Sequence, residues 1–393
     1  MTGADTVTGA DTVTGFDAVA FRRDLHQHPE LAYAEHRTTE RIVEALRGFG
    51  LAPTVLPAGT GVVCDVGPSG APRLALRADI DALPLQDEKD VPYRSTVEHV
   101  CHGCGHDAHT AILVAAAERL AAAGLPAPVR LVFQPAEETV PGGAVSVVES
   151  GAVEGIERIF ALHCDPRLET GQVGVRVGPI TAACDHIDIA LSGPGGHTSR
   201  PHLTADPVYA AGLIITQLPG LLSRRIDPRA GIAMVFGSVQ VGRAANAIPT
   251  NGTLGGTLRM LDRDASRQAE PLVRELVEQI VAPTGVTARI DYRRGVPPVV
   301  NDATSVALQR AAVLDALGED ALAATEQSMG GEDFAWYLDR IPGALARLGV
   351  RRPGAAAFDL HQGTFDIDED ALGVGTRFTV ALATAALTVG RGD

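Results

Sequence analysis

The stretch VRLVFQPAEE, residues 129–138, joins a short apolar run to two adjacent glutamates. On an exposed helix such a pair usually belongs to a solvated face, but here it follows a segment typical of a buried strand. Two carboxylates in that place are costly to bury unless a cation or a proton compensates their charge. Glu137 and Glu138 therefore predict a metal site, at which one glutamate binds the cation and its neighbour takes a proton from bound water.

Two further apolar runs end in polar residues in the same way. Residues 74–78 precede Asp79 and Asp81, and residues 159–162 precede His163. Because such runs alternate along the chain with helix-like segments, the pattern is that of an α/β fold. If the runs are strands of one mostly parallel sheet, all three polar sets emerge at its carboxyl edge, where open α/β sheets bind their ligands.

Residues 184–294 follow a different pattern. An alternating strand over 187–191 is followed by Asp206 and Pro207, which suit the N-cap and the first position of a helix that runs to about Leu218. The unit is completed by strands over 232–241 and 251–261, a helical repeat through 272–280 and a strand over 288–292. The order βαββαβ is that of a small ferredoxin-like domain, which we expect to serve as a lid or dimerisation domain.

The chain has 393 residues, more than one hydrophobic core usually organises, so two domains are predicted. The catalytic domain is discontinuous, over 16–183 and 295–393, with a mixed, mostly parallel sheet and helices on both faces. Helices are expected in its last part over 303–317, 331–340 and 369–386. Residues 184–294 are the inserted domain, and residues 1–15, which contain the repeat TGADTV, are predicted to be a disordered leader.

Composition and charge narrow the class of protein. Hydrophobic residues make up 45% and charged residues 21% of the chain, which suits a globular enzyme with a large core. The formal net charge of -15 disfavours nucleic acids and anionic membranes as partners and favours a small molecule. We recognise no uncharged apolar stretch of about 18 residues and no secretory signal, so a cytoplasmic location is expected.

The segment VCHGCGHDAHT, residues 100–110, is dense in residues that bind metals. Cys101 and Cys104 could form a redox pair, but the five cysteines, an odd number scattered over the chain, argue against a disulfide framework. Cys104 and His106, two residues apart in a turn before a helix, are better suited to bind one cation. Further candidates in the segment are His102 and His109.

Seven motifs in this order resemble those of a known family. They are LHQHPEL at Leu25, RADIDALP at Arg77, CGHDAHT at Cys104, QPAEE at Gln134, GGHTSRPH at Gly195, GGEDF at Gly330 and LHQGTFDIDEDAL at Leu360. From about residue 21 to 387 the sequence is similar to the aminoacylase, hippurate hydrolase and auxin-conjugate hydrolase group of dinuclear metallopeptidases. It departs from the family pattern at Cys101, where methionine is more usual, and at Gly331, where serine is more usual.

The resemblance implies a centre of two divalent metal ions, with zinc favoured and manganese, cobalt or nickel as alternatives. It implies that Cys104 bridges the two ions and that Glu137 is the general acid/base. The remaining ligands are then His106, Glu138, His163 and His361. Asp81 is similar to an acid that orients a metal-bound histidine in the family, and Asp79 is a candidate to share that role.

The same resemblance suggests a partner subunit and a substrate. His197 resembles a catalytic residue that reaches the active site of the partner subunit and stabilises the tetrahedral intermediate, which implies a homodimer. Asn246 and Arg259 match positions on the carboxylate side of the substrate. The predicted function is hydrolysis of the amide bond of N-acyl amino acids by metal-activated water, with glutamate as the general acid/base.

Three alternatives stay open. The nearest is a short-dipeptide hydrolase or a biosynthetic deacylase on the same scaffold. A thiol redox protein that cycles Cys101 and Cys104 belongs to another class, and it predicts activity that survives chelation. A catalytically silent, dimeric metal-binding module is the third, although such a site gains nothing from an unliganded, buried Glu137.

Overall fold

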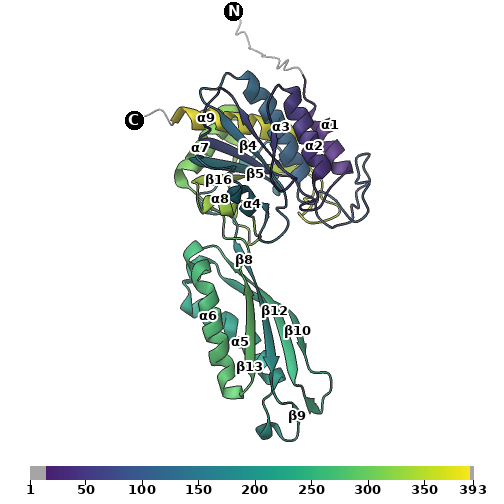
Figure 1. Ribbon diagram of the computed structural model, residues 1–393, viewed down its shortest axis with the longest axis vertical. Helices are drawn as coiled ribbons and strands as arrows, with labels where there is room; N and C mark the ends of the chain where they lie inside the picture. Colours follow the sequence, from purple (N-terminus) through teal and green to yellow (C-terminus); the bar gives the residue numbers. More distant parts are fainter. Residues whose placement is uncertain (1–14, 390–393) are drawn as a thin grey trace, which may run out of the picture.

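A computed structural model describes residues 15–389 as two bodies joined at one end (Figure 1). The expected leader, residues 1–15, lies outside the described residues except for Gly15. In the described part, the larger body is built on a sheet in the order β1-β2-β4-β3-β5-β16-β6-β15. Its strands are β1 Thr54–Val55, β2 Val62–Val66, β3 Leu74–Asp79, β4 Val129–Gln134, β5 Arg158–Glu169, β6 Val173–Gly174, β15 Leu322–Ala323 and β16 Gly343–Arg351. The central strands β4, β3, β5 and β16 run parallel, which confirms the mixed, mostly parallel sheet.

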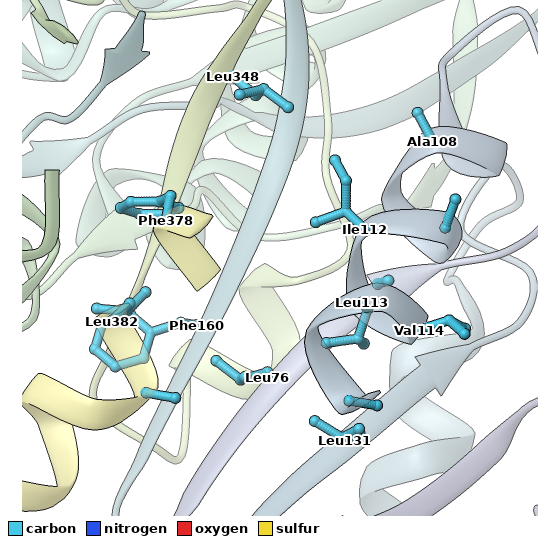
Figure 2. Close-up of a cluster of buried hydrophobic side chains, with 14 of the residues drawn as sticks. Leu76, Ala108, Ile112, Leu113, Val114, Leu131, Phe160, Leu348, Phe378 and Leu382 are labelled. Carbon is cyan, nitrogen blue, oxygen red and sulfur yellow. The ribbon is translucent and has the colours of Figure 1, made fainter. Parts of the chain in front are cut away.

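Helices cover both faces of this sheet, as the sequence predicted. One face carries α1 Ala18–Gln27, α2 His36–Gly48, α3 His106–Ala122, α7 Ala303–Ala316 and α9 Asp370–Val389, and the other carries α4 Gly143–Glu149 and α8 Ala335–Leu338. Figure 2 shows Leu76 of β3, Ile112 of α3 and Phe378 of α9 in one apolar cluster. Each large side chain buried here contributes roughly 1.5–3 kcal/mol. The layers therefore hold firmly the strands whose ends carry the polar residues.

Helix α9 is long and apolar enough to span a membrane by length and composition, over Asp370–Thr388. It carries Asp370 and Arg377, so it is not an uncharged apolar stretch. Half of it is buried inside the structure, where it packs against α3 and α7. A helix in the core of a folded domain can have the same length and composition, so α9 is only weak evidence for a membrane span.

The smaller body is an antiparallel sheet in the order β10-β12-β8-β13, with α5 and α6 on one face (Figure 1). Its main elements are β8 Ala183–Ser192, α5 Pro207–Arg225, β10 Ala233–Val241, β12 Asn251–Met260, α6 Arg263–Val281 and β13 Thr287–Arg293. This βαββαβ order with the first and third strands in the middle is the predicted ferredoxin-like arrangement. Asp206 caps α5, as expected, by accepting from the Val208 N–H at 2.9 Å. Residues of this sheet and of the two helices form a separate apolar core.

Two helices differ in length from those expected. Helix α5 continues beyond Leu218 because Leu222 is buried in the core of the smaller body, and this burial favours the extra turns. The helix expected over 331–340 is wrong for most of its length, since only the four residues of α8 are helical. The two acidic residues before α8 instead form buried ion pairs with Arg77, which fixes them outside a helix.

Candidate metal centre

The carboxyl ends of three parallel strands meet at one edge of the large sheet. Asp79 ends β3 and Asp81 follows it, Glu137 and Glu138 follow β4, and His163 lies within β5. Because β3 lies between β4 and β5, the three polar sets are neighbours in space. The sheet topology therefore brings together residues that lie far apart in the sequence.

Two loops complete this cluster. Helix α3 begins at His106, so Cys104 and His106 lie at its N-terminus. The turn that carries His361 is tied to the same loop, because the His361 N–H donates to the carbonyl of Gly103 at 2.8 Å. His361 has a φ of 60° and Ala136, directly before the glutamate pair, a φ of 57°. Such left-handed backbone without glycine is strained, and it persists only where surrounding contacts fix it.

The expected ligand atoms converge in two overlapping groups of three. Cys104, His106 and His163 form one group, and Cys104, Glu138 and His361 form the other. Within each group the ligand atoms all lie within 4.8 Å of one another. Cys104 Sγ is 3.6 Å from His163 Nε2, and Glu138 Oε1 is 3.3 Å from His361 Nε2. Both groups contain Cys104, so a cation held in either group would have its sulfur as a ligand.

This donor set fits a pair of divalent cations. His106 Nε2 and Glu138 Oε1 are buried without a hydrogen-bond partner among the described residues, which is costly unless a cation binds there. Thiolate, imidazole and carboxylate are ligands of zinc and its first-row neighbours. Burial, followed by the charge of Glu138, raises the pKa of the Cys104 thiol well above its ordinary value. A bound cation would overcome this effect and stabilise the thiolate.

Asp81 and Asp79 have different partners. Asp81 Oδ1 is 3.2 Å from His106 Nδ1, and Asp81 Oδ2 accepts a hydrogen bond of 2.9 Å from the Glu138 N–H. Asp81 thus directs His106 Nε2 toward the cluster, as an acid that fixes the tautomer of a ligating imidazole does. Asp79 Oδ1 lies 2.5 Å from Nδ1 of His109, whose other ring nitrogen accepts a backbone N–H. Both nitrogens of His109 are therefore engaged, so it is a supporting residue.

Behind Glu137 lies an acidic cluster that was not predicted from the sequence. Glu137, Glu332 and Asp333 bring carboxylate oxygens within 4.8 Å of one another. Burial, followed by the charge of Glu332, raises the pKa of Glu137 well above its ordinary value, and burial raises the pKa of Asp333 to about 8. Arg77 contacts Asp333 at 2.8 Å and Glu332 at 3.2 Å. The motifs RADIDALP and GGEDF contain these residues, but only the tertiary structure shows that they meet.

Replacing Arg77 by methionine is expected to lower the free energy of unfolding by about 3 kcal/mol, because buried carboxylates lose their shared cation. Thermal or urea unfolding measures the change. Arg73→Met is the matched control, because Arg73 lies directly before β3, the strand that carries Arg77. Its ion pair with Glu157 is exposed and should contribute less than about 1 kcal/mol. Equal losses in the two variants would contradict the role given to Arg77.

The cluster opens into a cleft of about 570 Å³, whose lining comes from both bodies. Cys104, Glu137 and His361 line it from the larger body, and Arg259 lines it from the base of the inserted domain. Arg259 Nη1 donates to the carbonyl of Met329 at 2.5 Å, which holds the guanidinium beside the cleft. A concave site of this size, lined largely by polar and charged residues, suits a small polar ligand.

His197 and Asn246 lie together, but far from the cleft of their own chain. His197 belongs to β9 (Gly196–His197), which pairs with β11 (Ala247–Ile248) directly after Asn246. Both residues are exposed at the end of the inserted domain that points away from the larger body (Figure 1). A single chain therefore does not bring them to the expected ligands. A role at this cleft requires a second subunit.

The surroundings of Cys101 argue against a redox centre. Burial raises the pKa of its thiol to about 11, whereas dithiol redox centres depend on a thiolate near neutral pH. Its backbone N–H and carbonyl both pair with Leu83, so Cys101 occupies a fixed, buried position. The cysteines of the described chain are all free. Cys104 is thus better explained as a ligand than as half of a redox pair.

Residues 75–385, which span both bodies and contain all the expected ligands, match a family model described as peptidase family M20/M25/M40. The chain belongs to peptidase family M20/M25/M40. Membership of the M20/M25/M40 family makes it a hydrolase that acts on amide bonds. This confirms the resemblance drawn from the seven motifs.

The relatives of this chain include an amide hydrolase and a solved peptidase of the M20 family. A putative glutamate--cysteine ligase 2-3 of Rhodococcus jostii (strain RHA1) is 49% identical over 93% of this chain, which spans 46% of that protein. An N-acetylcysteine deacetylase of Bacillus subtilis (strain 168) is 37% identical over 94% of this chain and 96% of its own length. The crystal structure of the Bacillus subtilis YXEP protein, a dinuclear metal-binding peptidase of the M20 family, has a TM-score of 0.83 at 34% identity, covering 94% of this chain and 98% of that one.

Proposed function

We propose that this protein is a metal-dependent amidohydrolase that releases amino acids from N-acyl amino acids. The observation that carries the proposal is the pair of ligand groups that share Cys104, with Glu137 beside them in the same cleft. The relative solved as a dinuclear metal-binding peptidase supports two divalent ions per chain. Zinc is the first choice because it favours thiolate and imidazole, although manganese, cobalt and nickel accept the same ligands.

In this proposal the cations are held by Cys104, His106, Glu138, His163 and His361. Bound there, they would polarise the amide carbonyl and lower the pKa of water. Glu137 is absent from the two ligand groups that share Cys104, but its carboxylate lies within 4.8 Å of the ligand atoms of His106 and Glu138, where it can take a proton from water. Burial and the charge of Glu332 raise the pKa of Glu137 above its ordinary value, which favours the protonated form after the transfer. Glu137 then passes the proton to the leaving amine, so one residue serves as base and acid.

We also propose a homodimer in which His197 and Asn246 of one chain reach the cleft of the other. Their exposure at the far end of the inserted domain supports this arrangement. The Ser199 N–H donates to His197 Nδ1 at 3.1 Å, which leaves Nε2 as the protonated donor. His197 would donate to the carbonyl oxygen as negative charge develops on it, while Arg259 holds the carboxylate of the amino acid. A cytoplasmic location is proposed on the strength of the sequence alone.

The acyl group is proposed to be small, and N-acetylcysteine is the first substrate to test. The support comes from the N-acetylcysteine deacetylase of Bacillus subtilis, which matches nearly the full length of both chains. The Rhodococcus relative is named for a ligase that acts on cysteine, but this chain spans less than half of that protein, so the choice of substrate does not depend on it. N-acetyl and N-benzoyl derivatives of other amino acids belong in the same set of substrates.

The test is amine release from N-acetylcysteine, N-acetylmethionine and N-benzoylglycine, with Gly-Leu as a dipeptide. We expect the zinc-loaded protein to hydrolyse at least one N-acyl amino acid, a chelator to abolish that activity, and added zinc to restore it. Hydrolysis of the dipeptide alone would replace the proposal by the peptidase alternative. Activity that survives chelation would favour the redox alternative, and metal binding without turnover of any substrate would favour the silent module.

A further inference from the structure

One arginine in the cleft has no partner in the described structure. Arg347 lies on β16 and is only 6% exposed, yet its Nε has no hydrogen-bond partner and no carboxylate of residues 15–389 lies within ion-pairing distance of its guanidinium. The two other buried arginines of that range, Arg22 and Arg77, each form ion pairs with acidic residues, such as Arg22 with Asp107 at 2.6 Å. Arg347 is therefore the exception among the buried arginines of the described chain.

The acids nearest to Arg347 are already engaged by other arginines. Burial lowers the pKa of Arg347, and the acids that oppose this effect most are Asp165 and Glu332. Asp165 is paired with Arg167 at 2.7 Å, and Glu332 is paired with Arg77 at 3.2 Å. A buried guanidinium without a directly paired acid is costly, so this position favours an anionic ligand.

Arg347 faces the place where a substrate has to bind. In the parallel pairing of β16 with β5 it is the register partner of His163, an expected metal ligand. Both residues line the same cleft as Cys104 and Glu137. A fixed positive charge beside a metal centre is unfavourable by itself, and a bound anion would offset it. The charge beside His163 therefore points to an anionic ligand.

We propose that Arg347 binds a second carboxylate of the substrate, so that the preferred substrates are amides that carry two carboxylates. The inference rests on the proposed amide hydrolysis, in which Arg259, from the other body, holds the carboxylate of the amino acid. The second carboxylate can belong to an acidic amino acid side chain or to a dicarboxylic acyl group. The recognition chemistry at Arg347 is the same in both cases, a bidentate guanidinium–carboxylate pair.

Two isosteric substrate pairs test this inference and separate the two sources. The first pair is N-acetyl-L-glutamate and N-acetyl-L-glutamine, and the second is N-succinyl-L-leucine and its terminal amide, N-succinamoyl-L-leucine. The expected result is a wild-type preference of about 10–100-fold in kcat/KM for the acid in one pair, the size of a charge-assisted hydrogen bond in a buried site. The pair that shows it identifies the source of the carboxylate.

Variants at Arg347 then assign the preference to this residue. Arg347→Met should bring the acid-to-amide ratio close to one, mainly through KM, and Arg347→Lys should restore part of it. Arg340→Met is the control, since Arg340 is exposed and its loss changes the net charge equally. Thermal unfolding and metal content are measured for each variant. A wild-type ratio near one in both pairs, or equal losses for acid and amide in Arg347→Met, would overturn the inference.

A binding measurement separates failure of this inference from failure of the proposed function. If wild type hydrolyses none of the four compounds, the proposed function is wrong for this set. Calorimetry on the metal-loaded Glu137→Gln variant then compares the acid and the amide of each pair. Tighter binding of an acid that disappears when Arg347→Met is added supports the second carboxylate site. Equal binding of acid and amide in both pairs excludes it.

Discussion

A Glu137→Gln variant is expected to lose activity by a factor of about 10²–10⁴ while it keeps its metal ions, because glutamine cannot move a proton between water and the leaving amine. The loss should fall on kcat, since the side chain lies outside the ligand groups that share Cys104. Steady-state kinetics on the best N-acyl amino acid, with metal content measured in parallel, checks both parts of the prediction.

The matched control for this variant is Glu149→Gln. Glu149 is exposed on α4, which follows β4 as Glu137 does. Its replacement removes the same charge without touching the cleft. We expect it to behave as wild type. A fully active Glu137→Gln protein would show that the general base is another group, and Glu332 would be the next to test because its carboxylate is adjacent. Loss of metal together with activity would instead make Glu137 a ligand.

Mixed dimers are expected to recover activity from two inactive variants. Glu137→Gln and His197→Ala homodimers each lack one component of every site. If His197 acts across the dimer, a heterodimer of the two contains one site with an intact Glu137 and an intact His197 from the partner. Random association then restores about a quarter of the wild-type sites, because half of the dimers are mixed and each has one complete site. Activity of co-expressed, separately tagged subunits measures this recovery.

The control mixture combines Glu137→Gln with His106→Ala. These two residues belong to the same chain's cluster, so neither site of that heterodimer is complete and no activity should return. Recovery in the first mixture and none in the second would assign His197 to the partner's site. A monomeric protein in solution, or a purified heterodimer that stays inactive, would refute the shared site. The distance of His197 from its own cleft would then leave it without a catalytic role.

Much of the centre could be predicted from the sequence because the decisive signals are local. An apolar run that ends in Asp79, in Glu137 or in His163 marks the end of a buried strand, and parallel strands present such ends at one edge. The inserted domain was predicted for a similar reason, since alternating and helical periodicities identify its elements one by one. His361 also follows an apolar segment, but a lone histidine of this kind is more often structural, and only the resemblance of its motif to the family indicated a ligand.

Other features depended on contacts between distant segments. The expected helix over 331–340 was wrong because Arg77, on a strand far away in the sequence, holds the acidic residues before α8. The helical periodicity of nearby residues contains no information about such a distant partner. The separation of His197 from its own cleft was implied by the family resemblance alone, because sequence spacing does not show which end of the inserted domain faces the larger body.

The sequence by itself determined the α/β architecture, the inserted ferredoxin-like domain and the set of candidate metal ligands, because these follow from periodicity and from sequence motifs. Only the tertiary structure decided that Cys104 is shared by two ligand groups, and that Arg77 neutralises the acids behind Glu137 while Arg347 is left unpaired in the cleft. The reason is physical. The energy of a buried charge depends on which groups lie within a few ångströms of it, and folding alone sets those distances.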